Sequence, residues 1–134
     1  SLVAAEKEDE IERLIMYYPA LCIPDDSRRG CVIGTKIDPN NVPDSFHGVF
    51  VKLGKKYVED ARTLDPYEQI CTFKKPVLII HGIEDKLVKI EYSRKAIERY
   101  ENCELIEVHG DHGFILKGFI AGKKATEKYL SDLN

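Results

Sequence analysis

The sequence has no apolar run that approaches the roughly 20 residues of a membrane-spanning helix, since its longest run covers residues 76–80. A basic excess is also missing. The net charge is -3 and acids and bases are interspersed, so we expect neither a membrane nor a nucleic acid as partner. Residues 1–7 have no basic start and no long apolar core, so they are not a signal peptide.

Metal-binding cysteine pairs are absent as well. The sequence contains no C-x-x-C pair and no His at zinc-ligand spacing, which argues against a zinc site. Scattered cysteines without a signal peptide favour reduced thiols and a cytoplasmic location over disulfides. No cysteine has a basic residue at a recognisable spacing in the sequence, so a cysteine nucleophile is not expected. The cysteines are Cys22, Cys31, Cys71 and Cys103.

The composition that remains is that of one globular domain, with 43% hydrophobic and 32% charged residues in 134. Short apolar runs at residues 14–18, 77–80 and 105–108 predict strands, and the first two suit a parallel sheet buried on both faces. Amphipathic patterns predict helices over 91–100 and 119–133. The fold class is therefore α/β, with three parallel strands and flanking helices. Residues 2–7 have the pattern of a helix tail.

The segment of about residues 20–70 is rich in Pro, Gly, Asp and Asn. We predict a hairpin that pairs residues 32–37 with 46–51 around a turn at 38–44. Helices are expected over 54–64 and 67–73. An insertion of this length between two sheet strands is typical of a lid or a binding element.

Two loops that follow predicted strands carry the chemistry, at residues 81–88 and 109–114. Ligands of open α/β sheets bind beyond the carboxyl ends of the strands, so Asp85 and His112 should converge there. A buried Asp fixes the tautomer of an imidazole, which can then take a proton from a nucleophile. We therefore predict Asp85 as the catalytic acid and His112 as the catalytic base.

The pattern H-G-x-x-D-x-x-V, helix, strand and G-x-H-G-F resembles the last third of α/β-hydrolases, which carry Ser, Asp or Glu, and His in that order. The stretches 18–20, 24–26, 38–44 and 64–68 resemble the inserted lid of bacterial feruloyl (cinnamoyl) esterases. This resemblance implies a serine hydrolase of small-molecule carboxylic esters, with an aromatic acyl group as one possibility. It implies no cofactor and no metal.

The nucleophile elbow of that family, G-x-S-x-G, is absent from the sequence. Ser1 does not fit it, because Leu2 and Val3 follow where a glycine is required. Residues 2–5 resemble the helix just after the elbow, so we expect the serine upstream of Ser1. The chain is then a fragment, and alone it should be inactive.

Other residues have simpler interpretations. Glu84 is the rival carboxylate, but the pattern places the acid at Asp85. His81 and His109 end strands and are interpreted as structural, whereas His47 is expected in an exposed loop. Asp111 neighbours His112 and could shape its loop, but we assign it no catalytic role. Residues 25–29 are interpreted as a solvated charge run.

Aromatic side chains are candidates for the lining of a substrate cleft. These candidates are Tyr17, Tyr18, Phe46, Phe50 and Tyr57. Tyr17 and Tyr18 are more typical of core residues, and Phe114 is interpreted as a packing residue.

Two functional alternatives remain open from the sequence. A peptidase or a thioesterase can use the same acid and base, because fold does not fix function. A non-catalytic binding fragment is the alternative from another class. The oligomeric state is not predicted.

Overall fold

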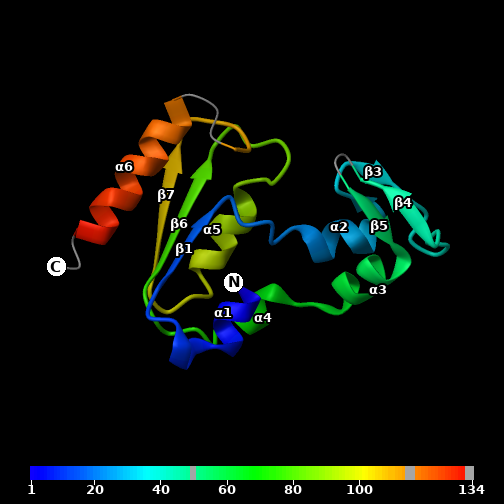
Figure 1. Ribbon diagram of the computed structural model, residues 1–134, viewed down its shortest axis with the longest axis horizontal. Coiled ribbons are helices and arrows are strands. Elements are labelled where there is room, and N and C mark those ends of the chain that lie inside the picture. Colours follow the sequence, from blue (N-terminus) through cyan, green and yellow to red (C-terminus); the bar gives the residue numbers. More distant parts are fainter. Residues whose placement is uncertain (49–50, 114–116, 132–134) are drawn as a thin grey trace. The chain divides into compact units, whose positions relative to one another are not determined.

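The computed structural model describes residues 1–48, 51–113 and 117–131, and the statements below concern these residues (Figure 1). The chain forms two compact units. The sheet unit comprises Ser1–Ala20 and Pro66–Asn134, and the inserted unit comprises Leu21–Asp65. Each unit is described by itself.

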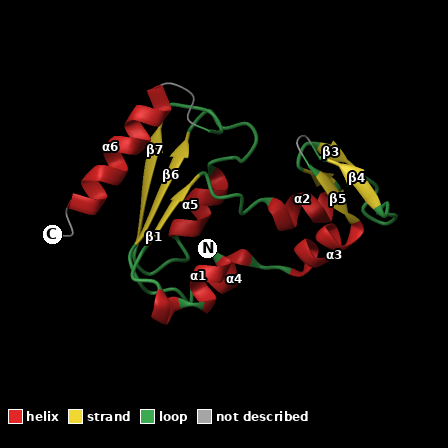
Figure 2. Ribbon diagram, in the orientation of Figure 1, coloured by secondary structure: helices red, strands yellow, loops and turns green. Residues whose placement is uncertain are grey.

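The sheet unit is built on three parallel strands in the order β1-β6-β7, which confirms the predicted α/β fold class (Figure 2). The strands are β1 (Leu14–Tyr17), β6 (Val77–Gly82) and β7 (Cys103–Val108). All six residues of the central strand β6 are buried, as expected of a parallel strand covered on both faces. The carboxyl ends of β6 and β7 lie side by side, because Gly82 pairs with Val108.

Helices cover the two faces of this sheet. Ala121, Ala125 and Tyr129 of α6 (Lys117–Ser131) pack on the face that carries Leu78 and Ile80. His81 lies next to Ile80 and therefore points to the opposite face. The remaining helical elements of the unit are α1 (Leu2–Glu6), the 3-10 turn η1 (Glu8–Glu10), α4 (Pro66–Ile70) and α5 (Glu91–Ile97).

Helix α5 is shorter than predicted, since it ends at Ile97 rather than at residue 100. The amides of Arg99 and Tyr100 both bond the carbonyl of Ala96, at 3.0 and 3.1 Å. This tight turn redirects the chain towards β7, which begins at Cys103. The predicted end of the last helix at residue 133 lies outside the described residues. No described helix is both long and apolar enough to cross a bilayer.

The inserted unit has its own core. Val32, Val42, Phe46 and Val58 are buried together, and Ile37 is among the partly buried residues that pack on them. The elements of the unit are α2 (Ile23–Arg29), β2 (Cys31–Val32), β3 (Thr35–Lys36), β4 (Ser45–His47), β5 (Lys52–Gly54) and α3 (Lys55–Thr63).

The predicted hairpin around residues 38–44 is wrong. Within the described residues, β2 pairs with β3 and β4 pairs with β5, so there are two short hairpins instead of one. The first turns at Ile33 and Gly34, whose φ angles are both positive at 45° and 77°. Positive φ at both central residues is typical of the type I′ turn that closes two-residue hairpins. Ile at the first of these positions hides the turn from sequence inspection.

Helix α2 was not assigned from the sequence, which presents it as a charge run. Its charges follow the helix dipole, with Asp25 and Asp26 in the first turn and Arg28 and Arg29 in the last. Each Arg pairs with the Asp three residues before it. Arg28 also donates to the carbonyls of Arg62 and Leu64, and this ties α2 to the end of α3.

Candidate active site

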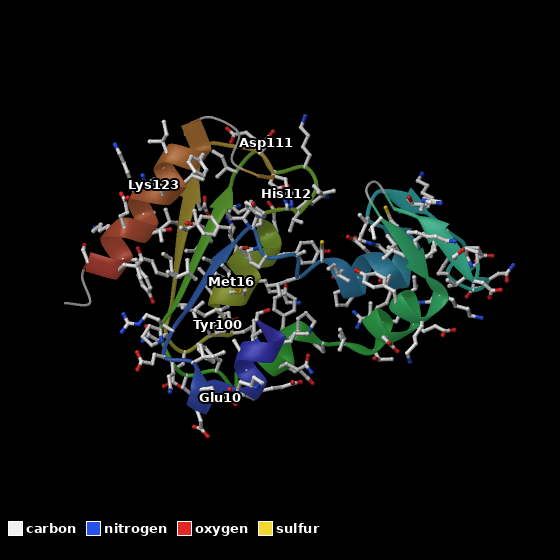
Figure 3. The ribbon with its side chains drawn as sticks, viewed as in Figure 1. Glu10, Met16, Tyr100, Asp111, His112 and Lys123 are labelled. Atoms are coloured by element: carbon white, nitrogen blue, oxygen red, sulfur yellow. The ribbon has the colours of Figure 1, made fainter. Side chains whose placement is uncertain are left out.

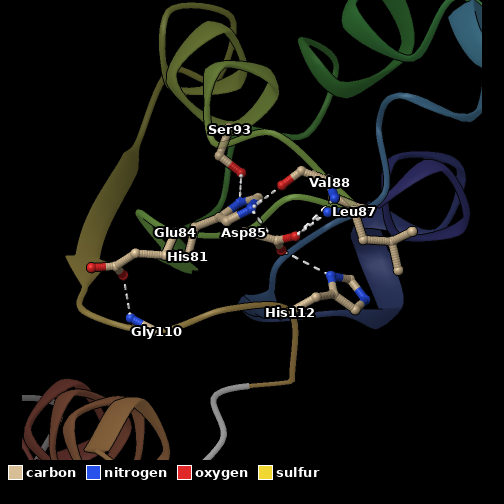
Figure 4. Close-up of polar contacts among 8 residues, drawn as sticks. All are labelled: His81, Glu84, Asp85, Leu87, Val88, Ser93, Gly110 and His112. Carbon is tan, nitrogen blue, oxygen red and sulfur yellow. Dashed lines mark hydrogen bonds and ion pairs between the residues drawn. The ribbon is translucent and has the colours of Figure 1, made fainter.

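The carboxylate of Asp85 is held in the loop that follows β6 (Figure 4). Its side chain is fully buried. Oδ1 accepts the backbone N–H groups of Leu87 at 2.9 Å and Val88 at 2.8 Å. An Asp that bonds backbone amides two and three residues ahead closes its own turn, so the loop sequence fixes the position of Oδ1.

The loops after β6 and β7 are joined by a clamp around Glu84. The amide of Glu84 donates to the Gly110 carbonyl at 3.1 Å. Its side-chain oxygens bond the Gly110 amide at 2.6 Å and Nδ1 of His109 at 2.9 Å. These bonds stabilise the charged carboxylate, and the His109 contact is the largest cause that lowers the pKa of Glu84. Glu84 thus fixes the path of the chain towards His112.

His112 meets Asp85 across these two loops. Nδ1 of His112 lies 2.8 Å from Oδ2 of Asp85. Because a carboxylate only accepts, Nδ1 carries the proton of this bond and Nε2 of the neutral ring is the basic nitrogen. Nε2 has no hydrogen bond within the part of the chain that the structure describes. The side chain is 31% exposed, so an incoming group can reach it.

Tyr18 packs on His112 from the end of β1. The two ring centroids lie 4.4 Å apart with the planes tilted by 55°. The Tyr18 amide donates to the carbonyl of Ile80, and its φ angle is 37°. Positive φ is uncommon for a bulky residue and costs about 1–2 kcal/mol. This backbone geometry and the contact with His112 occur at the same residue.

His81 is the second imidazole at Asp85. It is fully buried, and its Nε2 lies 2.9 Å from the Val88 carbonyl and 3.3 Å from Oδ2 of Asp85. Nδ1 lies 2.6 Å from Oγ of Ser93 on α5. Ser93, His81 and Asp85 contact one another in the same order as the residues of a catalytic triad. However, Ser93 has 0% exposure and bonds His81 rather than His112. It cannot meet a substrate.

The remaining predicted residues lie elsewhere. Asp111 is exposed on the loop between β7 and His112, and His47 is exposed on β4. Phe46 is buried in the core of the inserted unit, and Tyr57 packs against that core, so neither forms an open aromatic surface within the unit. Tyr17 is 39% exposed and bonds Thr126 on α6, which contradicts its interpretation as a core residue. Phe50 and Phe114 lie outside the described residues.

The four cysteines are free, and two of them have strongly shifted acidity. Burial raises the pKa of the Cys22 thiol to about 12, and a hydrogen bond with Asp26 adds to the shift. Burial also raises the pKa of Cys103 to about 12, with a contribution from the charge of Glu104. The described residues contain no group of three or more His, Cys, Asp or Glu side chains that could hold a metal ion.

Comparison with known proteins places the fold. No protein-family model matches the chain, and no curated protein matches it. Solved structures do match. A parallel sheet with an acid after one strand and a histidine after the next is the C-terminal part of α/β-hydrolase esterases, and this chain has that fold.

The structure of Est1E from Butyrivibrio proteoclasticus is similar to this chain with 33% sequence identity and a TM-score of 0.88. The match covers 98% of this chain and 55% of Est1E. Est1E has also been solved with ferulic acid bound, and this structure matches equally well. The resemblance to α/β-hydrolases and to feruloyl esterases that the sequence indicates is therefore confirmed.

More distant structures support the fold alone. The esterase domain of a Rhodothermus marinus protein matches with 19% identity and a TM-score of 0.62, over 92% of this chain and 55% of that chain. A monoacylglycerol lipase from Paleococcus ferrophilus matches with 18% identity and a TM-score of 0.61, over 96% and 62%. The chain spans little more than half the length of these proteins.

Proposed function

We propose that this chain supplies the catalytic acid and base of a serine hydrolase that acts on carboxylic esters. The single observation that carries the proposal is the 2.8 Å bond from His112 to the buried carboxylate of Asp85. It leaves a basic nitrogen on a partly exposed ring, which is the arrangement that general-base activation of a hydroxyl requires.

In the proposed mechanism, the serine hydroxyl of the whole protein gives its proton to Nε2 of His112 as its oxygen attacks the ester carbonyl. Asp85 then stabilises the positive imidazolium. The ring returns the proton to the departing alcohol, and a water molecule activated in the same way hydrolyses the acyl-enzyme. In α/β-hydrolases the serine precedes the acid and the base in the chain, so we place it upstream of Ser1.

We further propose a small ester with an aromatic acyl group, of the feruloyl or cinnamoyl kind, as substrate. Ferulic acid bound to Est1E supports this choice, because Est1E is 33% identical to this chain over the matched region, which covers 54% of Est1E. The inserted unit is proposed as the lid that selects the substrate. It begins three residues after Tyr18, which contacts the imidazole of the general base.

The test uses the full-length protein that contains this chain. Methyl ferulate and p-nitrophenyl butyrate should be hydrolysed, and a fluorophosphonate should label one serine upstream of Ser1. Asp85→Asn should lower kcat by about 10⁴-fold, because the amide holds the wrong tautomer of the histidine. Asp111→Asn is the matched control, and it should leave kcat within about twofold.

Three outcomes would contradict the proposal. Peptide or thioester turnover without ester turnover would move the reaction to another class. Ester turnover that survives in Asp85→Asn would remove this pair from the mechanism. A full-length protein that neither reacts with the fluorophosphonate nor hydrolyses any of these substrates would leave a non-catalytic binding function.

A further inference from the structure

His81 and His112 both reach the same oxygen of Asp85. Figure 4 shows the Asp85 carboxylate between the two imidazoles, with dashed contacts to each. The distances to Oδ2 are 2.8 Å for His112 and 3.3 Å for His81. The two rings differ in their surroundings, since the His81 side chain is fully buried and that of His112 is 31% exposed.

The contacts of His81 determine where its proton lies. The Val88 carbonyl, 2.9 Å from Nε2, can only accept, so Nε2 must donate. In the neutral ring Nδ1 then accepts, and the Ser93 hydroxyl at 2.6 Å is placed to donate to it. Ser93 thereby supports the tautomer in which Nε2–H donates to the Val88 carbonyl, and Nε2 then lies 3.3 Å from Oδ2 of Asp85.

The carboxylate of Asp85 thus has donors on both oxygens. Two backbone amides bond Oδ1, whereas Oδ2 is approached by His112 and by His81. Of the two imidazoles near Oδ2, only that of His81 is rigidly held, because both of its nitrogens are bonded inside the core. Without His81, the orientation of Oδ2 would depend on a partly exposed ring.

We propose that His81 is a positioning residue for the acid–base pair, and that Ser93 acts through it. The Nε2–H group donates to the Val88 carbonyl and keeps Nε2 3.3 Å from Oδ2 of Asp85, and this contact limits the carboxylate plane to which His112 aligns. The inference rests on the proposed function, because alignment of His112 matters for catalysis only if His112 is the base. It revises the purely structural interpretation of His81.

The geometry predicts which substitutions remove the contacts of His81 and which keep them. His81→Leu removes both the polar N–H group beside Asp85 and the acceptor for Ser93. His81→Gln keeps a side-chain N–H near the Nε2 position and an oxygen that can accept from Ser93. Ser93→Ala leaves the ring and its bond to Val88 but removes the hydroxyl that donates to Nδ1. Val77→Ala is the matched control, because Val77 is buried at the other end of the same strand.

The first measurement is steady-state hydrolysis by the full-length protein, at a temperature well below the melting point of each variant. His81→Leu should lower kcat by about 10- to 100-fold with KM nearly unchanged, as expected when a reacting group is misplaced by a fraction of an ångström to 1 Å. His81→Gln should recover most of the loss, and Ser93→Ala should show a smaller loss. Val77→Ala should lower the melting temperature and leave kcat unchanged.

The second measurement does not require turnover. In protein labelled with ¹⁵N at histidine, the ring shifts of His81 should report the Nε2–H tautomer, and Ser93→Ala should alter them. The Nδ1 proton of His112, bonded to Asp85, should move or broaden in His81→Leu and return in His81→Gln. If His81→Leu does not fold, the loss of kcat and the shift of the His112 signal in Ser93→Ala decide the question.

The two proposals fail in different ways. A wild-type protein without hydrolase activity that shows these spectral changes contradicts the proposed function and leaves the His81–Asp85–His112 coupling in place. Unchanged kcat and an unchanged His112 signal in folded His81→Leu, or in Ser93→Ala if His81→Leu does not fold, overturn the inference. Equal loss of kcat in Val77→Ala and His81→Leu would also overturn it, because a general loss of strand stability would then explain both.

Discussion

Gly82 lies so close to the loop after β7 that a β-carbon at this position would stand 2.2 Å from the carbonyl oxygen of Gly110. The contact joins the end of β6 to the chain that leads to His112. Any side chain here must push the two loops apart. The loops carry Asp85 and His112, and the lack of a side chain at Gly82 allows them to approach this closely.

Gly82→Ala should therefore damage both stability and the acid–base pair. We expect unfolding to become easier by about 1–3 kcal/mol, as for other overpacked sites. Urea denaturation measures the first effect, and the NMR signal of the His112 Nδ1 proton measures the second. A variant with wild-type stability and an unchanged proton signal would contradict this prediction, because the loops would then accommodate the methyl group without a loss of folding free energy.

The four cysteines should react with a thiol reagent at different rates in the folded chain. The pKa values of Cys22 and Cys103 are raised to about 12, so at pH 8 their thiolate fraction is more than about 100-fold below that of an ordinary thiol. Cys31 is exposed and should react first with iodoacetamide. Mass spectrometry of timed samples measures the order, and all four should react alike in urea. Early labelling of Cys22 or Cys103 in the folded chain would contradict this prediction.

The Glu84 clamp should weaken at acid pH. The pKa of Glu84 is lowered in the folded chain, mainly by His109 and then by the Gly110 amide. The stabilisation is therefore present above the unfolded pKa of about 4.3 and is lost as the pH falls through the lower folded value. Glu84→Gln should be less stable than the wild type at pH 6, and the difference should shrink below pH 4.

Chemical denaturation across this pH range measures the effect. Glu127→Gln is the control, because the Glu127 carboxylate is exposed and pairs with Lys123 within α6. The control should show little difference at either pH, as is common for exposed ion pairs. A difference for Glu84→Gln that stays constant from pH 6 to pH 3 would contradict the assignment.

The sheet could be predicted from the sequence because its physical signal is local. Residues 77–80 are apolar without interruption, and a strand buried on both faces requires this pattern. The approach of Asp85 to His112 was also predictable, since parallel strands end at the same edge. What the pattern could not give is the position of His81, because the sequence does not reveal that Ser93 and Val88 turn its ring towards Asp85.

The inserted unit was predicted less well, for a related reason. Its two hairpins have strands of two or three residues, too short to show a period of two. The Ile33–Gly34 turn lacks the Asn-Gly or Asp-Gly signature. Helix α2 has little apolar periodicity, and its ends are marked by Pro24 near the start and Gly30 after the end. Here caps and turns carry the information that hydrophobic pattern carries in the sheet.

The core around Val58 and the core around Leu78 have no residue in common. A substitution inside the first core therefore acts on side chains other than those that pack β6 against α6. If the inserted unit is the lid proposed above, changes in residues 21–65 would alter the choice of ester and leave the core behind Asp85 and His112 as it was.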